Sequence, residues 1–83
     1  MFSSAPNGWC VGSIRREKGI SLEEIANETK LKIATLRAIE AGNFAELPGG
    51  IYTVSYIRQF ARAIGADEAG LVQFYRSMYP SAA

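Results

Sequence analysis

The stretch that decides the fold runs from Ser21 to Gly42 and has the sequence SLEEIANETKLKIATLRAIEAG. Ser21 followed by Glu24 is a capping box, in which the hydroxyl accepts a hydrogen bond from a free amide and the Glu side chain reaches back. Two apolar stripes at helical spacing follow, and Gly42 ends the second in a left-handed cap. The stripes contain Leu22, Ile25 and Ala26, then Leu36 and Ile39. Two short helices joined by a tight turn predict a helix-turn-helix.

The rest of the chain predicts three more helices, over about residues 7–18, 51–64 and 67–78, and a loop over 43–50. A chain of 83 residues forms one domain with a small core, for which helices joined by short loops are an economical solution. We therefore predict an all-α five-helix bundle over residues 9–79. We expect residues 1–8 to be a flexible leader and residues 80–83 to begin a linker or a flexible tail.

Helical spacing also predicts which side chains face the core. For the first helix these are Trp9, Cys10 or Val11, and Ile14, and Phe44 and Leu47 are expected under the loop. For the fourth helix they are Thr53, Ile57, Phe60, Ala61 and Ile64, and for the fifth Leu71, Phe74, Tyr75 and Met78. The fourth helix has a further stripe beside its core face, formed by Tyr52, Tyr56, Gln59 and Ala63. This stripe either packs under the fifth helix or is presented to a partner protein.

The second helix of the helix-turn-helix is poorly equipped to read DNA. Direct readout favours Arg, Lys, Gln or Asn at its start. This chain offers Lys30 and Lys32, but Ile33 and Ala34 follow them. Lys30, Lys32 and Arg37, with Arg15 and Arg16, are candidates for contacts with phosphates. The alternative, which we favour, is a solvated face paired with Glu23, Glu28 and Glu40. Ile33 either contacts a thymine methyl or, as we prefer, extends the apolar stripe. The formal charge of +1 also lacks the basic excess typical of nucleic-acid binders.

The composition argues against an enzyme. The chain has no histidine, and Cys10 is its one cysteine, which we interpret as a small hydrophobe within the first helix. Pro48, Gly49 and Gly50 lack the Lys and Ser/Thr that complete a phosphate loop. We expect no catalytic residues, metal, cofactor or small-molecule substrate. No apolar run in this chain is long enough to cross a bilayer, so we do not expect this domain to enter the membrane.

Residues 21–26 and 36–42 resemble the Cro/C1-type (lambda repressor-like, Xre) helix-turn-helix. Residues 44–48, with Ile51, Tyr52, residues 56–62, Gly65 and Asp67, resemble more specifically the cytoplasmic N-terminal domain of the RodZ-like family of bacterial cell-shape proteins. The resemblance differs at Val11-Gly12, where the family usually has Leu-Arg, at Ser55, where it commonly has Gly, and at Phe60, where it often has Tyr.

This resemblance implies a cytoplasmic domain that precedes a linker and a single inner-membrane span in a longer parent chain. It also implies binding to the actin-like protein MreB through aromatic residues of the fourth helix, which correspond here to Tyr52 and Tyr56. Arg58 and Gln59 on the same helix are the polar residues that we expect to assist. The rival hypothesis is an Xre-family transcriptional regulator that binds DNA through Lys30, Lys32, Ile33 and Arg37.

Overall fold

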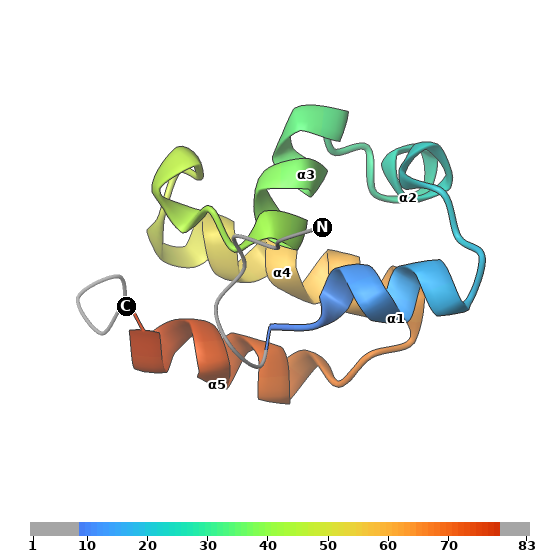
Figure 1. The fold of residues 1–83 in the computed structure, drawn as a ribbon. Helices are drawn as coiled ribbons and strands as arrows, with labels where there is room; N and C mark the ends of the chain where they lie inside the picture. The colour runs from blue at the N-terminus through green and yellow to red at the C-terminus, as the bar shows by residue number, and fades with distance from the viewer. Residues whose placement is uncertain (1–8, 79–83) are drawn as a thin grey trace.

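The computed structural model describes residues 9–78, which fold into five α-helices and a short 3-10 helix (Figure 1). The elements are α1 (Val11–Glu17), α2 (Leu22–Thr29), α3 (Ile33–Ala41), η1 (Phe44–Glu46), α4 (Gly50–Ile64) and α5 (Glu68–Met78). This order confirms the predicted all-α fold with five helices. The predictions for residues 1–8 and 79–83 lie outside the described residues.

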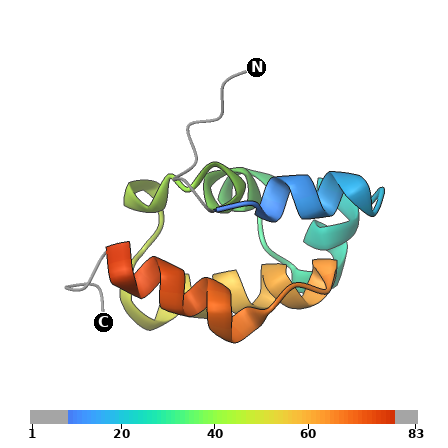
Figure 2. The ribbon, with the colours of Figure 1, turned by 60° about the horizontal axis from the view of Figure 1, so that its bottom comes forward.

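Helix α4 is the centre of the arrangement and contacts the other four α-helices. α5 runs back along α4 in the opposite direction, so that the end of α5 lies near the beginning of α4 (Figure 1). Figure 2 shows α1 and α3 on one side of the molecule and α4 with α5 on the other. The hydrophobic core lies between these two layers.

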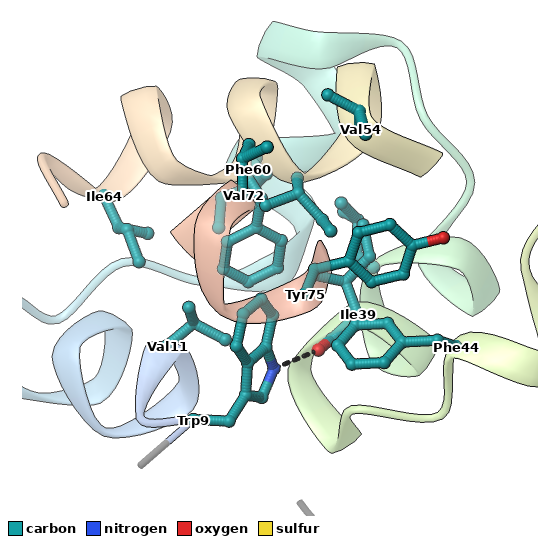
Figure 3. Close-up of a cluster of buried hydrophobic side chains, with 12 residues drawn as sticks. Trp9, Val11, Ile39, Phe44, Val54, Phe60, Ile64, Val72 and Tyr75 are labelled. Carbon is teal, nitrogen blue, oxygen red and sulfur yellow. Dashed lines mark hydrogen bonds between the residues drawn. The ribbon is translucent and has the colours of Figure 1, made fainter. Parts of the chain in front are cut away.

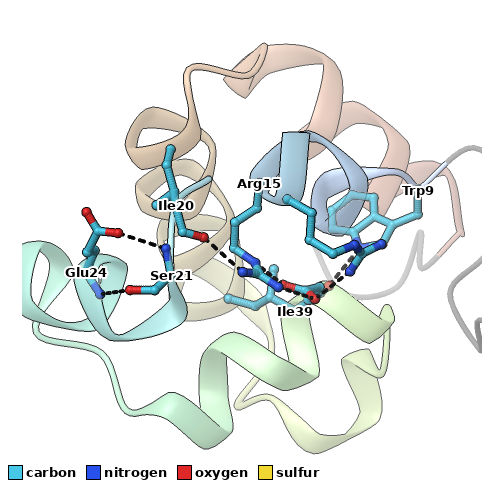
Figure 4. Close-up of polar contacts among 8 residues, drawn as sticks. Trp9, Arg15, Ile20, Ser21, Glu24 and Ile39 are labelled. Carbon is cyan, nitrogen blue, oxygen red and sulfur yellow. Dashed lines mark hydrogen bonds and ion pairs between the residues drawn. The ribbon is translucent and has the colours of Figure 1, made fainter. Parts of the chain in front are cut away.

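The capping box predicted for α2 is present. The Glu24 amide donates to Ser21 Oγ over 3.1 Å, and the Ser21 amide donates to Glu24 Oε1 over 2.9 Å (Figure 4). Lys30 then adopts a left-handed conformation with φ of 63°, which turns the chain toward α3. Gly42 ends α3 with φ of 70°, also left-handed. The helix-turn-helix over 21–42 therefore forms as the sequence predicts.

An aromatic cluster joins the start of the described chain to η1 and α5 (Figure 3). Trp9 packs edge-on against Phe44 with ring centroids 5.1 Å apart, and Phe44 packs edge-on against Tyr75 at 5.0 Å. The indole Nε1 of Trp9 donates a hydrogen bond of 2.6 Å to the backbone oxygen of Ile39. This bond satisfies the polar atom of a buried side chain and fixes the N-terminal segment on α3.

The prediction for the first helix is wrong at its start. α1 begins at Val11, and Cys10 precedes it with a non-helical φ of −116°. Cys10 is exposed, whereas Val11, the alternative core residue, is buried. Trp9 faces the core as expected but from outside the helix, because its indole reaches across to the last turn of α3.

The core faces of α4 and α5 follow the predicted pattern with three exceptions, Val54, Val72 and Met78. All five residues predicted for α4 are buried, and Val54 joins them. In α5, Met78 is 42% exposed rather than inward, and Val72, which was not predicted, is buried. Met78 stands on the last turn of α5, next to the beginning of α4, where no later turn of the described chain covers it.

Polar contacts hold α1 to its neighbours (Figure 4). Arg15 Nε donates to Glu40 Oε1 over 2.7 Å, and Arg15 Nη1 donates to the Ile20 oxygen over 2.9 Å. The hydrogen bond with Glu40 raises the pKa of Arg15 above its ordinary value, so the guanidinium stays charged. Lys18 Nζ donates to the Ile64 oxygen over 2.7 Å, which places a cation at the C-terminus of α4.

Candidate partner-binding surface

The beginning of α4 carries two large apolar side chains in solvent. Gly49 and Gly50 have φ of 88° and 57°, a region that glycine enters at little cost, and they turn the chain abruptly into the helix. The Gly49 amide donates to Thr53 Oγ1 over 2.7 Å, which fixes this turn on a buried residue of α4. The side chains of Ile51 and Tyr52, which follow directly, are 78% and 62% exposed.

The two tyrosines of α4, which the sequence leaves either packed or presented to a partner, differ in burial. Tyr52 is exposed, but Tyr56 is half-buried and packs against the hydrophobic core. At about 100° per residue, Tyr56 lies about 40° closer than Tyr52 to the centre of the core face. Tyr52 is therefore available to a partner, whereas Tyr56 offers one edge and also contributes to the fold.

Arg58 and Gln59, the predicted polar members of this surface, are half-buried along the same helix. Gln59 Nε2 donates to Ser55 Oγ over 3.2 Å. Glu68, at the start of α5, lies 3.8 Å from Arg58 Nη1 and accepts a hydrogen bond of 2.8 Å from Arg62 Nε. That bond raises the pKa of Arg62 above its ordinary value.

Sequence reasoning missed two members of the exposed surface. Ile51, Tyr52 and Met78 are the exposed large hydrophobic residues of the described chain. They lie at one end of the molecule, because α5 ends where α4 begins (Figures 1 and 2). The helical wheel of α4 could have identified Ile51. It falls on the same stripe as the polar residues Ser55, Arg58 and Arg62, where an apolar side chain is not expected. We call Ile51, Tyr52 and Met78 the apolar end.

The candidate nucleic-acid-binding residues lie around the turn between α2 and α3. Lys30, Lys32 and Arg37 are exposed, and Ile33 is half-buried against the core, as the preferred interpretation has it. The expected pairing with acids holds for Arg15 and Arg16, which both pair with Glu40. It is wrong for Lys30, Lys32 and Arg37, because no carboxylate of residues 9–78 lies within 4.0 Å of them.

Cys10 and the acidic residues are the side chains of residues 9–78 whose chemistry suits metal binding. The interpretation of Cys10 as a core hydrophobe is wrong, because its side chain is exposed just before α1. Within residues 9–78, no group of three or more Cys, Asp or Glu side chains is placed to hold a metal ion. None of the helices in this part of the chain combines the length and the apolar character that a membrane span requires.

These features, a capped helix, a left-handed turn and a second helix packed on a helical core, define a helix-turn-helix protein. The chain belongs to the family described as helix-turn-helix domain, whose model matches residues 13–71. Over 63 residues it is 33% identical to the cytoskeleton protein RodZ of Streptococcus pneumoniae. Over 62 residues it is 32% identical to the uncharacterized membrane protein YmfM of Bacillus subtilis.

The matched regions cover 76% and 75% of this chain but only 23% and 22% of the two relatives. The chain thus spans less than a quarter of the length of each relative. A comparison with solved structures gives no match. The resemblance to RodZ-like proteins is confirmed, and the chain is a RodZ-like helix-turn-helix domain. Neither the family description nor the relatives' names indicate an enzyme.

Proposed function

We propose that this chain is the filament-binding domain of a RodZ-like cell-shape protein, and that it binds the actin-like protein MreB through α4. The observation that carries the proposal is the exposure of Tyr52, at 62%, beside Ile51, at 78%. Among the other aromatic residues of 9–78, Trp9, Phe44, Phe60 and Tyr75 are buried and Tyr56 and Phe74 are half-buried, so the exposed ring of Tyr52 adds little to the stability of the domain. Tyrosines in such positions are enriched among the residues that dominate protein–protein binding.

The proposal assigns distinct roles to the four residues predicted for this surface. Tyr52 is the anchor, because a rigid ring gives a large contact area at a small entropic cost. Tyr56 supports it from a half-buried position, and Arg58 and Gln59 supply polar contacts at the rim. We place the domain in the cytoplasm, where MreB filaments lie, at the end of a parent chain that the membrane holds through a single span. No cofactor or small molecule takes part.

Co-sedimentation with MreB filaments tests the assignment. Tyr52→Ala is expected to weaken binding about tenfold or more, because truncation of a hot-spot residue costs roughly 1–3 kcal/mol or more of binding free energy. The free energy of unfolding is expected to stay unchanged. Tyr52→Phe keeps the ring and serves as the matched control, with most of the binding retained. Tyr52→Ala combined with Tyr56→Ala is expected to abolish binding, and circular dichroism must show that this double variant still folds.

Arg16→Ala, on the exposed side of α1, controls for nonspecific effects of a surface substitution. Binding by the folded double variant that equals the binding of the wild-type domain would refute the assigned surface.

A second function, contact with DNA, has one observation in its favour. Lys30, Lys32 and Arg37 are exposed around the start of α3 with no carboxylate of the described chain within 4.0 Å. Ala38, one turn into α3, is buried at 6% exposure and so has no access to a base edge. We therefore propose that any DNA binding is made through phosphates and does not select a sequence.

A further inference from the structure

A hollow of about 250 Å³ opens between α4 and α5. Its lining consists of Arg58, Ala69, Val72, Gln73 and Arg76. Val72 is 3% exposed and belongs to the core, so the floor of the hollow is apolar. The remaining lining contains two guanidinium groups and one amide but no carboxylate.

The positive charge of this hollow is only weakly compensated. Glu68, the nearest acid, is engaged by Arg62 through a hydrogen bond of 2.8 Å. Its other oxygen lies 3.8 Å from Arg58 Nη1, too far for a hydrogen bond. Arg76 is exposed, and no carboxylate of residues 9–78 lies within 4.0 Å of it. The hollow therefore has guanidinium donors that remain free to bind an anion.

The hollow lies on the same side of α4 as Ile51, a residue of the apolar end. On a wheel of about 100° per residue, Ile51, Arg58 and Arg62 fall within about 40° of one another on the solvent side of α4. Ile51 and Arg58 are seven positions apart on α4, a distance of about 10 Å along the axis. One protein interface of about 800 Å² per partner easily covers both.

We propose that this hollow receives an Asp or Glu side chain of the protein that covers the apolar end, and this proposal rests on the function proposed above. Arginine suits such a contact, because its planar fork of donors matches a carboxylate and gives short, charge-assisted hydrogen bonds. The adjoining apolar end favours a protein over a nucleic acid, since Ile51 and Met78 find apolar side chains only on a protein surface. The partner surface therefore has an apolar patch about 10 Å from an acidic residue.

The test measures the affinity of MreB filaments for the wild-type domain and for Arg76→Gln and Arg58→Gln at two salt concentrations. Arg76→Gln is the cleaner variant, because no ion pair of the described chain is lost with it. Each variant is expected to bind about tenfold more weakly, the effect of losing a hydrogen bond to a charged group. Each is also expected to show a weaker dependence on salt. Arg16→Gln on α1 is the matched control, with affinity unchanged.

The outcomes separate this inference from the function on which it rests. If both arginine variants bind as tightly as Arg16→Gln while Tyr52→Ala does not bind, the hollow has no role. Filament binding through Tyr52 then stands, without the rim contact assigned to Arg58. If the wild-type domain does not bind filaments, both proposals fail. If Arg76→Gln weakens binding to a random DNA duplex as much as binding to filaments, the hollow is a general phosphate site and the inference is wrong.

Discussion

Gly12 shows how a single missing side chain allows α1 to lie close to α3. A Cβ added at this position would stand 2.8 Å from Glu40 Cγ and 3.0 Å from Cδ. Glu40 is not free to move away, because Arg15 holds it through two hydrogen bonds. We expect Gly12→Ala to destabilise the domain by about 1 kcal/mol in urea unfolding, because the cost of overpacking exceeds the gain in helix propensity.

A double-mutant cycle identifies the cause of that loss. In a Glu40→Ala background the clash is absent, so Gly12→Ala is expected to be neutral or slightly stabilising. Equal destabilisation in both backgrounds would show that the contact with Glu40 is not the reason for a glycine here.

Residue-level predictions succeeded where a side chain's neighbours lie on its own helix. Thr53, Ile57 and Phe60 repeat at helical spacing and are buried as expected. Trp9 was correctly expected to face inward, but its hydrogen bond to Ile39, 30 residues away, depends on how α3 lies against the N-terminal segment. The exposure of Cys10 follows from the same packing, which periodicity alone does not contain.

The turn between α2 and α3 stores strain at one residue. Lys30 is the one non-glycine residue of the described chain with a positive φ, 63°. The left-handed region costs an L-residue about 1–2 kcal/mol, whereas glycine enters it freely but loses more entropy on folding. We expect Lys30→Gly to raise the free energy of unfolding by about 0.5–1 kcal/mol, measured by thermal or urea unfolding.

Lys32, two residues later, gives the matched control for the turn. Its φ of −71° and ψ of 148° are ordinary extended values. Lys32→Gly is therefore expected to destabilise the domain, since glycine adds entropy to the unfolded chain and relieves no strain. If the two glycine substitutions had the same sign, the strain assigned to Lys30 would be absent.

At the scale of elements, the sequence predicted best the helices that carry explicit end signals. Ser21 with Glu24 starts α2, and Gly42 and Gly65 end α3 and α4 in left-handed conformations. α1 has no side-chain cap, and its start was predicted about four residues too early. In α5, whether Val72 or Met78 is buried depends on where α4 begins beneath the helix. That position is set by packing and not by periodicity.

For the candidate surface, the sequence predicted the correct helix but not the full set of exposed residues. Tyr52 was found because two tyrosines one turn apart stand out on the wheel of α4. The inward position predicted for Met78 was wrong, and packing or exposure stayed open for Tyr56, because both depend on the position of neighbouring helices. Arg76 was missed for the same reason, since its place beside Arg58 arises only when α5 packs back along α4.

At the scale of the whole molecule, the two candidate surfaces have different chemistry. The surface of α4 and α5 combines exposed apolar side chains with arginines, a composition suited to a protein partner. The turn before α3 offers cations, but α3 adds few side chains that can read bases, because Ala34 is short and Ala38 is buried. A helix-turn-helix fold by itself does not decide between these functions.

Titration of DNA duplexes by fluorescence anisotropy decides whether the second surface reads sequence. With Lys30, Lys32 and Arg37 as its cations, the domain contacts about three phosphates, so the logarithm of its affinity should fall with log salt at a slope of about −3 or shallower. Random and candidate operator duplexes should then bind equally weakly, and Lys32→Ala should weaken both alike. A regulator would instead bind one operator with nanomolar affinity and lose that preference on the same substitution. Arg37 is the one side chain of α3 that can make a bidentate contact with a base. We therefore expect equal and weak binding to random and operator duplexes.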